Sequence, residues 1–148
     1  MRYFVILLCL CLALSSCTDM AQSVQEILAS EMSSSGVLPA GECYHFVMGR
    51  NDNNPLSDEL LHDLYGEDAK DVFLLIEAYA LYLSSGEPCE IAVLQCYARS
   101  DVDRVAQMCL ARGDRLRTVL LHTSYYERAK KIEVSVRGRV VVMRMLAQ

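Results

Sequence analysis

Among the residue types that could do chemistry in this chain of 148 residues, cysteine allows the most detailed predictions. Four cysteines lie beyond residue 17, and no two have the two-residue gap of a CxxC motif, so neither a redox motif nor a zinc ribbon is predicted. Cys89 and Cys96 share one expected strand, where an extended span of about 23 Å prevents a disulfide between them. A disulfide from Cys43 to Cys89 or to Cys109 is the alternative in an exported chain. We expect Cys43, Cys89, Cys96 and Cys109 all to remain thiols, and Cys89, beside the turn at Pro88, to react fastest.

Histidines and carboxylates show no spacing that would build a metal or catalytic centre. His45, His62 and His122 lie far apart, and the acidic clusters at 58–59 and 67–71 lack the alternating oxygens and central glycine of a calcium loop. The sequence contains no glycine-rich phosphate loop and no nucleophile elbow. We therefore predict no catalytic, cofactor-binding or metal-binding residue and no cofactor.

Tyrosines leave two interpretations open. Strand tyrosines usually close the edge of a core, and they can also line a groove for a peptide or a glycan. The tyrosines concerned are Tyr79, Tyr82, Tyr97, Tyr125 and Tyr126.

The first 17 residues carry the clearest functional pattern. Arg2 precedes an unbroken apolar run over residues 3–14, which fits a signal peptide and is shorter than the roughly 20 residues of a membrane-spanning helix. The run ends in Leu14, Ser15, Ser16 and Cys17, a sequence that resembles the lipobox of bacterial lipoproteins. In a lipobox the thiol takes up a lipid, and the small residues before it fit the peptidase. We expect a lipoprotein signal peptide over 1–16 and lipidation of Cys17. The alternatives are cleavage by ordinary signal peptidase, an uncleaved anchor and a buried first helix.

Helix signals follow in the mature chain. A helix is predicted over 24–34, where Ser23 and Glu26 have the spacing of a capping box. Ser57 is expected to cap a short helix that Gly66 ends. The longest helix is predicted over about 101–121, with a weaker capping box of Ser100 and Asp103 and a kink at Gly113 as one option. Its apolar face is expected to contain Val102, Val105, Ala106, Cys109, Leu110, Leu116, Val119 and Leu120.

Strand signals complete the fold. A short strand is predicted over 43–48, a hairpin over 72–83 and 91–97, and a second hairpin over 132–136 and 140–146. The fold class is therefore α+β: a small antiparallel sheet of two hairpins flanking a long helix, with short N-terminal helices. One sheet of four strands, covered on one face by the long helix, buries these apolar faces most simply. The expected organisation is a signal peptide over 1–16, a lipidated N-terminus, helix and tether over 17–40, and a single α+β domain over 41–148.

Several features together resemble a bacterial lipoprotein family known only as domain of unknown function 4358. They are the lipobox, the strand opening at 90–93, the arginine-bearing helix after it with Arg112, and the closing hairpin at 136–142. Apart from the lipobox they fall within residues 72–146, about half the chain, and 18–71 fit only loosely. The resemblance implies location and fold, and it implies no activity, cofactor or catalytic residue.

Charge is distributed unevenly along the chain. The formal net charge is −5, which favours neither nucleic acid nor anionic lipid as a partner. Residues 18–98 contain 14 acidic and 2 basic residues (−12), and residues 99–148 contain 5 acidic and 11 basic residues (+6). The two halves are expected to complement each other side by side. A basic C-terminal surface that meets anionic headgroups or wall polymers is the alternative.

These patterns predict a membrane-anchored extracytoplasmic lipoprotein that acts as a non-catalytic binding or accessory module of the cell envelope. Its expected partners are membrane lipid, through Cys17, and an envelope protein, with no nucleic acid. The alternative is a small hydrolase acting on the envelope, with carboxylates that the sequence does not group.

Overall fold

The computed structural model describes residues 22–129 and 131–146. The predicted signal peptide over residues 1–16 and the predicted lipidation site Cys17 lie outside the described residues.

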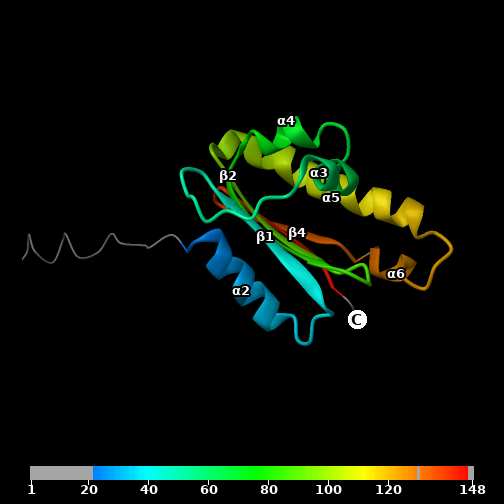
Figure 1. Cartoon of the computed structure of the whole chain (residues 1–148). Coiled ribbons are helices and arrows are strands. Elements are labelled where there is room, and N and C mark those ends of the chain that lie inside the picture. The colour runs from blue at the N-terminus through cyan, green and yellow to red at the C-terminus, as the bar shows by residue number, and fades with distance from the viewer. Residues whose placement is uncertain (1–21, 130, 147–148) are drawn as a thin grey trace, which may run out of the picture.

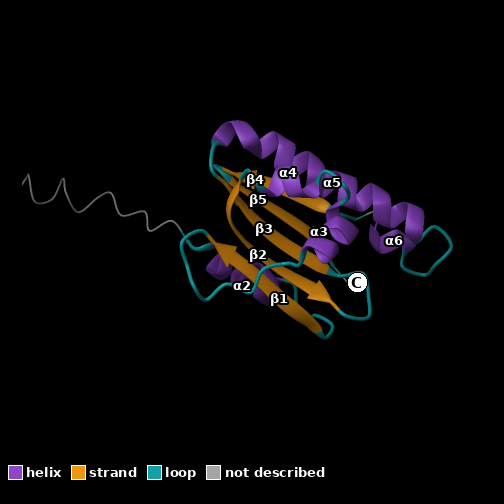
Figure 2. Ribbon diagram, turned by 45° about the horizontal axis from the view of Figure 1, so that its top comes forward, coloured by secondary structure: helices purple, strands orange, loops and turns teal. Residues whose placement is uncertain are grey.

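One antiparallel sheet of five strands forms the centre of the protein (Figure 2). The strands are β1 (Gly41–Val47), β2 (Ile76–Ser84), β3 (Glu90–Cys96), β4 (Glu133–Arg137) and β5 (Val140–Met145), in the spatial order β1-β2-β3-β5-β4. The two predicted hairpins are present as β2–β3 and β4–β5, and they join through β3 and β5. The α+β class is confirmed. The expected count of four strands is wrong, because the segment at 41–47 pairs with β2 along its whole length.

Helices cover both faces of the sheet (Figure 1). On one face lie α3 (Asp58–Tyr65), α4 (Ala69–Phe73) and α5 (Val102–Val119), and on the other lies α2 (Val24–Ser34). A 3₁₀ turn, η1 (Arg99–Asp101), leads into α5, and α6 (Tyr126–Ala129) follows it. Because both faces are covered, β2 and β3 are buried almost throughout instead of alternating between buried and exposed residues.

The N-terminal helix α2 belongs to the folded domain. It begins with the expected capping box, in which the Ser23 hydroxyl accepts from the Glu26 amide and the Glu26 carboxylate accepts from the Ser23 amide. Val24 and Leu28 are buried against β2 and β3. The predicted domain start at residue 41 is therefore too late, because the helix assigned to the tether supplies part of the core.

The long helix α5 turns a narrower face to the sheet than the apolar pattern indicated. Its buried residues are Val102, Val105, Met108, Cys109 and Gly113. Leu110, which we expected in the core, is 42% exposed, and Val119 is 76% exposed. The Ser100–Asp103 box is absent, because the 3₁₀ turn occupies residues 99–101 and α5 begins after it without a side-chain cap. The helix runs unbroken through Gly113, where Ile132 packs so closely that a Cβ atom would lie 2.9 Å from its Cδ1.

The segment predicted as one strand over 72–83 contains two elements. Residues 69–73 form the short helix α4, closed by a bond from the Leu74 amide to the Lys70 carbonyl, and β2 begins only at Ile76. Val72 is buried and Phe73 packs against the same core cluster, so tertiary contacts outweigh their preference for strands. The helix predicted before it is confirmed, with Ser57 capping α3 and Gly66 ending it at a φ of +90°.

Candidate functional site

A buried polar cluster connects α3 and α5 to the sheet. Glu90, the first residue of β3, is fully buried and accepts two hydrogen bonds. Tyr65 at the end of α3 donates its hydroxyl to Glu90 Oε1 at 2.7 Å, and Arg112 of α5 donates Nε to Oε2 at 3.1 Å. The resemblance had placed Glu90 and Arg112 in separate motifs, and the fold makes them a buried ion pair.

Burial favours the protonated forms of two groups at this cluster. Burial, reinforced by the Glu90 carboxylate, raises the pKa of Tyr65 well above 10.0. Burial, again with Glu90 nearby, also raises the pKa of the Cys109 thiol well above its ordinary value. A thiol becomes nucleophilic as its pKa falls, so Cys109 is inert in this environment. The cluster therefore holds the helices on the sheet.

A second arginine of α5, Arg115, contacts the turn after α3. Arg115 donates to the Leu64 carbonyl oxygen at 3.0 Å, and its guanidinium lies against Gly66, where a Cβ atom would collide with it. Its Nε is buried and has no hydrogen-bond partner within the described residues. Burial and then the neighbouring charge of Arg112 lower the pKa of Arg115. Glycine is favoured at position 66 because its φ of +90° is a conformation that other residues rarely adopt.

An open groove of about 520 Å³ lies beside this cluster, between α3, α4 and the β1–β2 side of the sheet. This volume falls within the roughly 300–1,000 Å³ of ligand-binding clefts. The residues lining it are Phe46, Asp58, Leu61, Lys70, Asp71, Phe73, Leu74, Ile76 and Tyr79. We call this feature the apolar groove, and it is the candidate functional site.

Aromatic side chains from three elements form the floor of the apolar groove. Tyr79 of β2 stacks on Phe46 of β1 with ring centroids 5.8 Å apart. Phe73 of α4 meets Tyr79 edge to face at 5.4 Å. The Tyr79 hydroxyl accepts from the Leu56 amide at 2.9 Å, so the polar end of the ring is satisfied inside the protein. The groove is therefore preformed by rigid rings.

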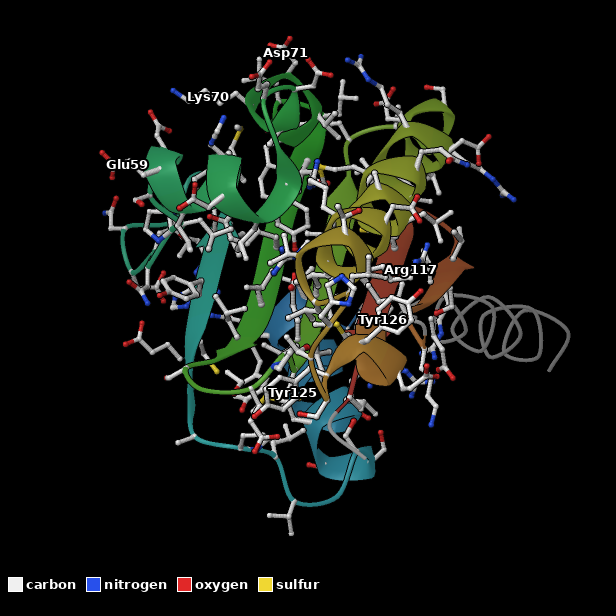
Figure 3. All side chains as sticks on the ribbon, turned by 90° about the vertical axis from the view of Figure 1, so that its right-hand side faces the viewer. Glu59, Lys70, Asp71, Arg117, Tyr125 and Tyr126 are labelled. Carbon is white, nitrogen blue, oxygen red and sulfur yellow. The ribbon has the colours of Figure 1, made fainter. Side chains whose placement is uncertain are left out.

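Charge surrounds this apolar floor. Asp58 and Lys70 form an ion pair at 2.6 Å, and Asp71 has no ion-pair partner among the described residues. Residues 58–71 contain six acidic residues and one lysine, a net charge of −5. Figure 3 shows Glu59, Lys70 and Asp71 projecting from α3 and α4 on the outside of the molecule. Leu74 at the rim is 76% exposed, which leaves an apolar side chain uncovered beside the carboxylates.

The tyrosines named from the sequence do not form one groove. Tyr79 lies in the floor described above, whereas Tyr82 is buried on the opposite face and donates its hydroxyl to the Pro39 carbonyl oxygen. Tyr125 and Tyr126 lie together at the far end of α5 (Figure 3). Sequence reasoning missed Phe46 and Phe73, and no spacing could have paired them, since they belong to elements far apart in the chain.

The remaining candidates for chemistry stay separate. His45 bonds through Nε2 to the Asp52 carbonyl oxygen at 2.7 Å, His62 lies 3.6 Å from Asp63, and His122 is on the surface. Across the parts of the chain that the structure describes, no group of three or more histidine, cysteine or carboxylate side chains could hold a metal ion.

The four cysteines beyond Cys17 form no disulfide with one another. The burial of the four thiols does not match the exposure on which the predicted order of reactivity is based. Cys89 is 1% exposed, Cys96 and Cys109 are also buried, and Cys43 on the edge strand β1 is exposed. The turn at Pro88 does not expose its neighbour, because Cys89 packs in the core on the α2 side of the sheet.

Within residues 22–129 and 131–146, no helix has both the length and the apolar character needed to cross a membrane. Comparison with protein-family models, with curated proteins and with solved structures finds no match to the chain.

Proposed function

We propose that the protein is a lipid-anchored binding module on the extracytoplasmic face of a bacterial cell membrane. In this proposal Cys17 carries the lipid, and the apolar groove takes an apolar segment of an envelope protein that is flanked by positive charge. The relation to domain of unknown function 4358 belongs to the same proposal.

The leader supports the location. An apolar run too short to span a membrane, followed at once by Leu14, Ser15, Ser16 and Cys17, is the arrangement that lipid attachment requires. The described domain then begins with α2 at Val24, a few residues after the anchor point. This spacing would hold the domain close to the membrane surface.

The proposed binding function rests on the apolar groove. Soluble surfaces rarely leave a concave, aromatic-floored site uncovered unless something binds there. Its rim adds specificity, because the carboxylates around Leu74 repel acidic segments and attract basic ones. An apolar segment with neighbouring lysine or arginine satisfies both the floor and the rim.

Binding of short helical peptides tests this proposal. The full chain, placed in neutral phosphatidylcholine nanodiscs, is titrated with a fluorescent peptide that has leucines on one face and arginines elsewhere, and anisotropy is recorded. We expect saturable binding, and roughly tenfold weaker binding for Leu74→Gln because an apolar contact is lost. Asp71→Asn should weaken binding of the arginine peptide, and a peptide with glutamate in place of arginine should not bind.

Val37→Gln is the matched control, because Val37 is 98% exposed and does not line the groove. Equal affinity of Leu74→Gln, Val37→Gln and the unmodified chain would contradict the proposal.

The hydrolase alternative would need carboxylates that converge in an accessible cleft. Among the described residues, Glu90 and Glu31 each gather polar partners from two other elements, and both are buried. The carboxylates at the groove, Asp58 and Asp71, border an apolar floor.

A further inference from the structure

The C-terminal end of α5 presents a second uncovered apolar surface. Val119 is 76% exposed and Leu121 is 51% exposed, and Arg117 precedes them on the same end of the helix. We call these three residues the α5 knob. Residues 113–131, which follow Arg112 of the buried ion pair, contain five basic and two acidic residues, a net charge of +3. The knob is thus apolar and belongs to a segment of net positive charge, opposite in sign to the segment that borders the apolar groove.

We propose that the apolar groove of one copy receives the α5 knob of a second copy. This inference rests on the proposed function, since it names the basic, apolar segment that the groove takes. Val119 and Leu121 would meet the aromatic floor, and Arg117 would approach Asp71. Arg117 pairs with Asp114 within α5, and such an exposed pair is weak enough to be exchanged for a new partner.

One copy cannot fill its own groove. The start of α5 is held beside the groove, because the Tyr97 amide donates to the Leu75 carbonyl oxygen just before the helix begins. From there the 18-residue helix extends about 27 Å and carries the knob away. The helix also lies over β3, β5 and β4, whereas the groove lies at the β1–β2 side. The knob therefore needs a groove on another molecule.

The position of the knob favours a second copy over the anchoring membrane. α2 begins at the opposite end of the molecule from the end of α5 (Figure 1). Cys17 precedes Gln22 by five residues, which span at most about 17 Å. The lipid would therefore hold the end of the molecule that is far from the knob.

A head-to-tail contact of this kind uses a different surface on each copy, so it leaves one groove and one knob open for further copies. The contact is small, and we expect it to be weak between freely diffusing molecules. Confinement to one membrane raises the effective concentration of the partners, which suits a weak contact.

The test uses two differently tagged full-length chains expressed in the same bacterium. A photo-reactive aromatic amino acid replaces Leu74 in one chain, and adducts with the other tag are measured after illumination. We expect an adduct containing both tags. Asp71→Arg in the first chain, or Arg117→Asp in the second, should lower its yield roughly tenfold because like charges then meet. Both substitutions together should restore most of the yield.

The photo-reactive residue at position 37 is the control and should give no adduct with the second copy. Absence of the two-tag adduct from position 74, or a yield that charge reversal does not change, would overturn this inference. An adduct from position 74 with a different protein would overturn it as well, while leaving the peptide-binding function intact. Loss of peptide binding in the nanodisc titration would instead defeat the proposed function itself.

Discussion

Glu90 shows how a single buried charge is accommodated in this protein. Removing a carboxylate from water is costly unless hydrogen bonds and an opposite charge replace the solvent, and Tyr65 and Arg112 provide both. The pair joins β3 to α5, so the charge also specifies how the helix lies on the sheet. Buried ion pairs of this kind add little net stability, but removing one partner leaves the other uncompensated.

Arg112→Met should therefore lower the free energy of unfolding by about 3–5 kcal/mol, because Glu90 is left without its cation. Urea denaturation at neutral pH measures the loss. Arg104→Met, an exposed arginine on the same helix, should change stability by less than about 0.5 kcal/mol. Adding Glu90→Gln to Arg112→Met should recover part of the loss, since the amide still accepts from Tyr65. No recovery would show that Arg112 acts through packing alone.

Cys109 and Tyr65 make the free energy of unfolding depend on pH in the alkaline range. Burial raises the pKa of both groups in the folded state, whereas in the unfolded chain they titrate near 9.0 and 10.0. Above pH 9 the unfolded state releases protons that the folded state keeps, so stability is full below that pH and falls as pH rises. The thiol contributes a slope of about 1.4 kcal/mol per pH unit. That slope is reached well above pH 9, so in Cys109→Ala the decline between pH 9 and 10 should be shallower by about 1 kcal/mol, as measured by urea denaturation across the range. An unchanged slope would mean that Cys109 is accessible to hydroxide.

At the scale of elements, α5 shows that an apolar residue on a helix is not necessarily buried. Val105 and Leu110 are both apolar residues of this helix, yet Val105 is 0% exposed and Leu110 is 42% exposed. The narrow contact face arises because α5 lies on a sheet already covered in part by α3 and α4. Its outward apolar residues, with Val119 at the end, are therefore left for solvent or for a partner.

Val105→Asp should prevent folding or cost several kcal/mol, because a carboxylate without a partner would be buried. Leu110→Asp should lower the free energy of unfolding by no more than about 1 kcal/mol, since the new charge remains hydrated. Thermal melting followed by circular dichroism distinguishes the two. Equal losses in both variants would mean that α5 lies on the sheet with a different rotation.

At the scale of the whole molecule, the charged halves of the chain do not cancel completely. Salt bridges do cross between them: Glu31 of α2 meets Arg137 and Arg144 of the last hairpin, both at 3.3 Å, and Glu77 meets Arg139 at 3.1 Å. The carboxylates of α3 and α4 nevertheless remain on the outside at one place, and Arg117 with its neighbours lies at another (Figure 3). The segment that borders the apolar groove is therefore acidic, −5 over residues 58–71, and the segment that carries the α5 knob is basic, +3 over residues 113–131.

Cys17→Ala should abolish lipid attachment, because the alanine has no thiol to take up the lipid. Cells grown with a radioactive or alkyne-bearing fatty acid should label the unmodified chain and leave the variant unlabelled and unprocessed. Cys43→Ala, which removes the exposed thiol of the folded domain, is the control and should label normally. Equal labelling of Cys17→Ala and the unmodified chain would end the lipoprotein hypothesis.

The sequence by itself determined the α+β class, most element positions and the caps at Ser23 and Ser57, because these depend on spacing along the chain. Tertiary structure decided what depends on neighbours in space. Residues 69–73 became a helix because Val72 and Phe73 pack against the core, and Leu110 stayed outside because α5 rotates toward Val105. The Glu90–Arg112 pair and the ring contacts of Phe46, Phe73 and Tyr79 join elements that only folding brings together. Local hydrogen bonding and periodicity are encoded within a few residues, whereas burial and a binding groove depend on the packing of the whole chain.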